Sequence, residues 1–93
     1  MVKIVWTNFA VEDLNSIHSY IAADSKIYAD RFIEKIISRV DQLETFPNSG
    51  RIVPEFESET LRELIEGNYR IVYRIHSDHI GILRIHHSAQ ELK

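Results

Sequence analysis

Three strand-like segments in the last third of the chain are separated by turns of only two residues. The segments, rich in β-branched and aromatic residues, are TLRELIE (60–66), YRIVYRIH (69–76) and HIGILRIHH (79–87). Gly67-Asn68 is a strong hairpin signal, and Ser77-Asp78 is equally short. Because a two-residue loop can join only antiparallel neighbours, these segments predict a three-stranded antiparallel meander.

Two apolar stripes at helical spacing precede these strands. The residues of the stripes are Ala10, Leu14, Ile17 and Ile21, followed by Ala29, Phe32, Ile33, Ile36, Ile37, Val40 and Leu43. Spacings of three and four residues place each stripe on one face of a helix. Thr7 is the expected N-cap of the first helix, and Asp24 or Ser25 that of the second. Because only Ala23–Ser25 separates the helices, they should form an antiparallel hairpin that ends at Phe46–Gly50.

The remaining segments complete a single predicted domain over residues 1–93. VKIVW (Val2–Trp6) has the composition of a strand, and the sequence leaves its pairing partner open. RIVPEFESE (Arg51–Glu59) is predicted to be a loop or a weak edge segment, because Pro54 cannot donate a ladder hydrogen bond. The order is β-α-α-β-β-β. We therefore expect an α+β fold in which a helical hairpin packs on one face of a small antiparallel sheet.

Composition argues against several classes of function. The net charge of −3 disfavours indiscriminate nucleic-acid binding. The chain has no cysteine, and His86-His87 should point to opposite faces of a strand, so we expect neither a metal site nor a cofactor. The lack of cysteine suits a cytoplasmic location. No apolar run approaches the length of a membrane span, so we expect no membrane contact.

Strand alternation sorts the arginines of the YRIVYRIH segment onto one face. One face carries Arg70, Val72, Arg74 and His76, and the other carries Tyr69, Ile71, Tyr73 and Ile75. The second set is more apolar and should meet the helices. The opposite face is then predicted to present guanidinium groups on an apolar floor, which suits an anionic or extended partner. A merely solvated sheet face is the ordinary alternative.

The two turns predict a register for this face. Counting through Ser77-Asp78 puts Arg74 opposite Gly81 and Arg70 opposite Ile85. The candidate binding residues on this face are therefore Arg70, Arg74, His76, Leu83 and Ile85.

The same register creates a difficulty with other charged residues. It places Arg62, Arg84 and His86 on the helix side of the sheet, where charge is unfavourable. Either these residues lie near the margin of the sheet, or a β-bulge shifts the register. The sequence does not choose between the two.

Several short motifs, in their order and spacing, are similar to those of a known family. The motifs are A..DL..I..YIA (Ala10–Ala22), A..FI..I (Ala29–Ile36), L..FP.SGR (Leu43–Arg51), LRELI.G.YRIVYRI (Leu61–Ile75) and I.ILRIHH (Ile80–His87). Together they resemble the RelE/ParE superfamily of toxins from bacterial toxin–antitoxin modules over nearly the whole chain. The resemblance implies the same element order, a small cytoplasmic toxin, and a cognate antitoxin that wraps an extended or helical segment around it.

The resemblance implies one of two actions. RelE-like members cut mRNA in the ribosome without a metal, using a base, cations at the phosphate and an acid for the leaving oxygen. On this chain the resemblance would make Arg70 the strand cation, His87 the acid or base and Arg62 an auxiliary cation. ParE-like members inhibit DNA gyrase, perform no chemistry of their own and need only a binding surface.

Departures from the family pattern favour the ParE-like action. Relatives often carry an arginine three residues after the last-strand histidine, where this chain has Gln90. No tyrosine follows Tyr73, and the second helix is long. We therefore predict gyrase inhibition, with a ribosome-dependent endoribonuclease or an inactive antitoxin-binding relative as alternatives. Arg70→Ala should weaken toxicity with little effect on folding.

The expected partners follow from these readings. They are a cognate antitoxin together with DNA gyrase, or with the ribosome and mRNA in the alternative. Both a homodimer and a toxin–antitoxin hetero-oligomer remain open.

Overall fold

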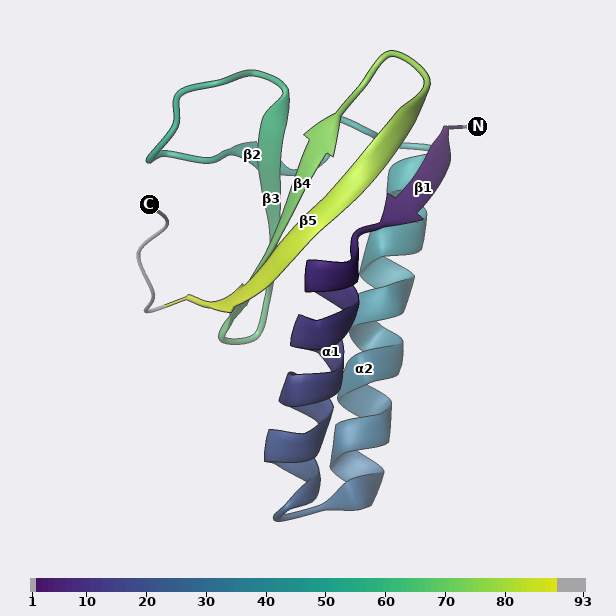
Figure 1. The fold of residues 1–93 in the computed structure, drawn as a ribbon, viewed down its shortest axis with the longest axis vertical. Helices are drawn as coiled ribbons and strands as arrows, with labels where there is room; N and C mark the ends of the chain where they lie inside the picture. Colours follow the sequence, from purple (N-terminus) through teal and green to yellow (C-terminus); the bar gives the residue numbers. More distant parts are fainter. Residues whose placement is uncertain (1, 89–93) are drawn as a thin grey trace.

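The computed structural model describes residues 2–88, which form a helical hairpin and a five-stranded sheet (Figure 1). The strands are β1 (Lys3–Trp6), β2 (Arg51–Ile52), β3 (Leu61–Glu66), β4 (Tyr69–Ile75) and β5 (His79–His87). The helices are α1 (Asn8–Ala22), α2 (Lys26–Asp41) and a short 3₁₀ turn, η1 (Gln42–Glu44). The predicted α+β class and element order are confirmed. The weak edge segment contributes one further strand, β2.

The strands lie in the order β1-β5-β4-β3-β2. The three predicted strands form an antiparallel meander, and β2 adds to its outer edge. Strand β1 pairs in parallel with β5, with Lys3 opposite His79. The partner that the sequence left open is therefore the strand farthest from β1 along the chain, and the sheet is mostly rather than wholly antiparallel.

Both long helices begin at the side chains that cap them. The Thr7 hydroxyl accepts a hydrogen bond from the Ala10 amide (3.1 Å), and the Ser25 hydroxyl accepts one from the Tyr28 amide (3.2 Å). A hydrogen bond between His18 Nε2 on α1 and Asp30 Oδ1 on α2 (2.7 Å) joins the two helices. Within residues 2–88, neither helix combines the length and hydropathy that crossing a bilayer requires.

The main core lies between the helical hairpin and one face of the sheet. Its buried residues are Ala10, Ile17, Ile36, Val40, Leu43, Leu64, Ile71, Tyr73, Ile80, Ile82 and Ile85. The predicted helical stripes, apart from the exposed Ile37, meet the apolar face of β4 here, as alternation requires. A second, smaller cluster of Val53, Leu61 and Val72, with Leu83 packed against it, lies on the opposite face. That opposite face is therefore partly covered.

Tyr73 explains the FPNSG motif that follows α2. Its buried hydroxyl donates to the Pro47 carbonyl (2.8 Å) and accepts from the Gly50 amide (2.9 Å). A Cβ atom on Gly50 would lie 2.6 Å from that hydroxyl and 2.7 Å from the Glu63 carbonyl oxygen. The motif thus lets the backbone turn tightly against a buried tyrosine.

A β-bulge lies where β5 passes Val72 and Tyr73 of β4. Arg74 pairs with Gly81 as predicted, but Val72 pairs with Arg84, which leaves Leu83 as the extra residue. Beyond the bulge, the register of β5 is shifted by one residue from the predicted one, so its side chains alternate in the opposite sense.

The bulge corrects part of the predicted register. Arg70 pairs with His86 and not with Ile85, so the prediction for Ile85 is wrong. Ile85 lies in the main core beneath the helices and is not on the opposite face. Arg84 reaches α1, where its Nε donates to Asp13 (2.8 Å), and Asp13 also accepts from the Ile85 amide (2.9 Å).

Candidate functional site

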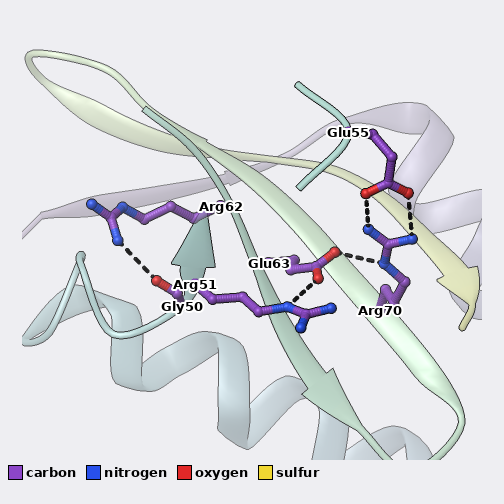
Figure 2. A network of polar contacts seen from close by, with 6 residues as sticks. All are labelled: Gly50, Arg51, Glu55, Arg62, Glu63 and Arg70. Carbon is purple, nitrogen blue, oxygen red and sulfur yellow. Dashed lines mark hydrogen bonds and ion pairs between the residues drawn. The ribbon is translucent and has the colours of Figure 1, made fainter. Parts of the chain in front are cut away.

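Arg70 lies at the centre of a closed ion-pair network on the sheet face opposite the helices (Figure 2). Its Nε donates to Glu63 (2.6 Å), and its two terminal nitrogens donate to the two carboxylate oxygens of Glu55 (both 2.8 Å). Only 6% of Arg70 is exposed. The predicted face is right, but the expectation of an exposed guanidinium is wrong, because residues 53–60 cover it.

Glu63 holds the network together from strand β3. Its side chain is fully buried and accepts hydrogen bonds from Arg70 and from Nε of Arg51 (2.5 Å). The hydrogen bonds to Glu55 and Glu63 together outweigh burial and raise the pKa of Arg70 above its ordinary value. The two arginines and two glutamates balance one another, so the network carries no net charge.

Arg62 serves the backbone of the neighbouring loops. Its guanidinium donates to the carbonyl oxygen of Gly50 (Figure 2) and to that of Glu59, each at 3.0 Å. It lies at the margin of the sheet, which is one of the two arrangements that the sequence left open. These contacts fix the loops on either side of β2.

Arg74 and His76 remain accessible near the β4–β5 turn. Arg74 donates to the hydroxyl of Thr60 (3.1 Å), and in residues 2–88 no carboxylate lies within ion-pair distance of it. The exposed His76 ring stacks on His79, with 4.3 Å between ring centroids. Leu83 lies nearby but is packed against the small apolar cluster. Arg74 and His76 are therefore the predicted binding residues that an incoming partner can reach directly.

His87 lies on the helix side of the sheet and not beside Arg70. Its ring meets the edge of Tyr69, at 5.5 Å between centroids, and it lines a cavity of about 470 Å³. The cavity is lined by Tyr20, Ile21, Tyr28, Phe32, Gly67, Asn68, Tyr69 and His87. Burial raises the pKa of Tyr69. The cavity is aromatic and lies between the tips of the helical hairpin and the β3–β4 turn.

The predicted catalytic residues Arg70, His87 and Arg62 do not converge. His87 pairs with Tyr69, the residue that precedes Arg70 on β4. Paired side chains share a face and successive side chains alternate, so Arg70 and His87 project from opposite faces of the sheet. Arg62 pairs with Tyr73, and His87 pairs with Tyr69. These two partners are four residues apart on β4, which is about 13 Å of strand. Gln90, where relatives often carry arginine, lies outside the described residues.

Sequence reasoning missed the two carboxylates that surround Arg70. A signal for Glu63 was present, since it alternates with Leu61 and Ile65 on one face of a strand and sits opposite Val72. A buried acid at such a position requires a cation nearby. The part played by Glu55 has no comparable local signal, because it depends on where a loop lies. Among residues 2–88, no three histidine, aspartate or glutamate side chains are grouped closely enough to hold a metal ion.

Comparison with known proteins gives consistent matches along the chain. Residues 4–92 match the family model described as the ParE toxin of the type II toxin–antitoxin system parDE. Toxin RelE2 of Caulobacter vibrioides is 34% identical over 91 residues, covering 97% of this chain and 99% of that protein. The putative toxin Y4kP of Sinorhizobium fredii is 35% identical, covering 96% and 91%.

Solved structures show the same fold. A chain of the chromosomal ParDE toxin–antitoxin system from P. aeruginosa superposes with a TM-score of 0.76 at 27% identity, covering 94% of this chain and 96% of that one. A chain of the toxin–antitoxin complex RelBE2 from Mycobacterium tuberculosis gives 0.66 at 19% identity, covering 92% and 96%. The second match is evidence for the fold alone.

Proposed function

The chain belongs to the ParE toxin family of type II toxin–antitoxin systems, within the RelE/ParE superfamily, and we propose that it acts by binding, as an inhibitor of DNA gyrase. The observation that carries the proposal is the closed network at Arg70. RNA cutting would require this guanidinium to meet a phosphate, whereas Glu55 and Glu63 occupy it here. A binding toxin needs a complementary surface and no acid–base pair, so the closed network is compatible with its action.

The positions of the candidate acid and base also support binding over catalysis. A general acid or base must come within hydrogen-bond reach of the reacting atoms. His87 lies on the helix side and Arg70 on the opposite side, so one phosphate could not meet both without a change in the sheet. The buried core on the helix side opposes such a change.

The surface that we propose for target contact surrounds Arg74 and His76. Both lie on β4 or at its end, on the face away from the helices, and both are accessible. Arg74 has a hydroxyl as its hydrogen-bond partner, so an external carboxylate could add an ion pair without breaking an internal one. Such a surface suits an acidic patch on a protein target.

The cognate antitoxin, the partner that a type II toxin has, would use a different surface. We propose that it covers the aromatic cavity at the tips of the helical hairpin, where Tyr20 and Tyr28 are 78% and 60% exposed. Large exposed aromatic side chains around a cavity are typical of protein interfaces. An amphipathic segment of the antitoxin could place an apolar side chain in the cavity.

Tyr28→Ser tests the proposed antitoxin surface. It should weaken binding of the cognate antitoxin by about tenfold or more in titration calorimetry. Ile27→Ser is the matched control, because Ile27 is similarly exposed on α2 but does not line the cavity. Equal losses in the two variants would contradict this assignment.

Purified gyrase provides the test of the proposed action. The protein should inhibit supercoiling when present in stoichiometric amounts, and Arg74→Ala should reduce that inhibition by about tenfold. Arg31→Ala, which removes an exposed arginine from α2, should inhibit as well as the unaltered protein. Uninhibited supercoiling at a clear molar excess of toxin would refute the proposal.

The second candidate is a ribosome-dependent endoribonuclease. It is retained because two curated relatives, at 34% and 32% identity, carry the name RelE. On this reading the network at Arg70 would have to open before a phosphate could bind. Cleavage of a reporter mRNA in the presence of ribosomes, and its absence without them, would establish this activity.

A further inference from the structure

Residues 53–60, which we name the strap, lie over the sheet face opposite the helices. The strap begins at Val53, which is fully buried and packs in the small cluster with Leu61 and Val72. Its amide donates to the Leu61 carbonyl at 3.2 Å. Two residues later, Glu55 reaches Arg70 from above the sheet (Figure 2). The strap is therefore anchored by an aliphatic side chain followed, two residues on, by a carboxylate.

The two carboxylates that meet Arg70 are held differently. Glu63 belongs to a central part of the sheet, has no exposed side-chain surface and also binds Arg51. Glu55 belongs to an irregular segment, and 29% of its side chain is exposed. Its carboxylate binds the Arg70 guanidinium in a bidentate manner, which a carboxylate from another molecule could reproduce. Glu55 is thus the replaceable member of the network.

The strap has further features of a displaceable segment. Glu55, Glu57 and Glu59 give it three acidic side chains without a basic one. Glu57 has a φ of 49°, in the left-handed region that residues other than glycine rarely adopt. Without the Glu55 carboxylate, Arg51 and Arg70 would outnumber Glu63 by one positive charge. The face beneath the strap therefore carries an apolar cluster beside a cationic group.

We propose that this face is a docking site for an extended acidic segment of a partner protein, and that the strap occupies the site until such a segment displaces it. The strap itself defines the chemistry of the occupant: an aliphatic residue for the cluster of Leu61, Val72 and Leu83, and a glutamate two residues later for Arg70. A nucleic acid fits less well, because a phosphodiester supplies no aliphatic side chain and Glu63 remains beside Arg70. The proposal goes beyond gyrase inhibition and does not depend on it.

A peptide that copies the strap tests the proposal without gyrase. Isotope-labelled protein is titrated with the synthetic peptide IVPEFESE, the sequence of residues 52–59, and the amide and arginine Nε–H signals are followed by NMR. Glu55→Gln loosens the strap, whereas Glu59→Gln makes the same change of charge at an exposed residue. Glu55→Gln should bind the peptide about tenfold more tightly than the unaltered protein or Glu59→Gln. The shifts should centre on Arg70, Val72 and Leu83.

Two further measurements identify the occupant. Replacing the first glutamate of the peptide with glutamine should abolish the preference for Glu55→Gln. Equal peptide affinity in all three proteins, or shifts away from Arg70, would overturn the proposal. Inorganic phosphate is titrated in parallel, and shifts at Arg70 with phosphate but not with peptide would overturn the acidic segment as occupant.

A second pair of variants covers the case in which Glu55→Gln does not fold. Val53→Ala weakens the other anchor of the strap, and Ile52→Ala alters a neighbouring exposed residue. Val53→Ala should likewise bind the peptide more tightly than Ile52→Ala does. Identical affinities in this pair would count against displacement of the strap.

Discussion

Arg70→Ala should lower the free energy of unfolding by about 3 kcal/mol. Removing one partner of a buried ion pair costs about 3–5 kcal/mol, because the remaining charge stays buried without compensation. The fully buried Glu63 would keep only Arg51, whose side chain is 60% exposed and whose attraction is screened by water. Glu55 is partly exposed and adds less. The lower end of the range is therefore expected, and this reverses the expectation from sequence that the change would spare the fold.

Urea unfolding measures this loss. With a slope of about 2 kcal/mol per M, a loss of about 3 kcal/mol moves the midpoint by about 1.5 M. Arg74→Ala is the matched control and should change stability by no more than about 0.5 kcal/mol, since this arginine is partly exposed and bonded to a hydroxyl. The double change Arg70→Met with Glu63→Met should recover most of the loss, because no buried charge is then left alone.

The result that would refute this reasoning is a midpoint for Arg70→Ala no lower than that for Arg74→Ala. The network would then contribute nothing to stability. An effect on toxicity at unchanged stability would restore the view that Arg70 acts mainly on a partner.

Three further predictions concern other parts of the fold. Tyr73→Phe should lower stability by about 1–3 kcal/mol in urea unfolding, because it leaves the buried amide of Gly50 without its acceptor; an unchanged midpoint would show that water replaces the hydroxyl. Gly67→Ala should lower the thermal midpoint and cost about 1 kcal/mol of the free energy of unfolding, because Gly67 has a φ of 58° in the β3–β4 turn. Ser77→Ala, at an exposed residue of the β4–β5 turn, should leave the midpoint unchanged. Burial alone would raise the pKa of Asp13, but hydrogen bonds from Arg84 and from the Ile85 amide outweigh it and hold the pKa below 3.8. Asp13 should therefore add about 1 kcal/mol to the free energy of unfolding at neutral pH, and this contribution should be lost as the pH falls below about 3.8. The difference in stability between the unaltered protein and Asp13→Asn should shrink in acid, and a difference independent of pH would contradict the assignment.

Local patterns were sufficient for most of the element order. The helical stripes, the caps at Thr7 and Ser25, and the Gly67-Asn68 turn act over a few residues and appear directly in the sequence. The parallel pairing of β1 with β5 could not be predicted in the same way. It joins segments that are far apart along the chain, and strand composition does not specify which edge a strand will join.

The site was less predictable because two long-range features decide it. The bulge at Leu83 moves Ile85 into the core, and a one-residue shift of register leaves no clear trace in an alternating apolar segment. The burial of Arg70 depends on the position of Val53 and Glu55 in a segment that Pro54 marks only as irregular. Alternation therefore gave the correct face for Arg70 but could not show that another part of the same chain covers it.

The parallel pairing of β1 with β5 also has a consequence during translation. The Thr7 hydroxyl bonds to the Ile82 carbonyl, 75 residues away along the chain. The ribosome makes β1 before any other strand of this sheet and β5 after all of them, so nascent β1 has no edge to join while the intervening residues emerge. Closing so long a loop is entropically unfavourable and slow. The emerging polypeptide should accordingly stay incompletely folded, and accessible to chaperones and proteases, until β5 has left the ribosome.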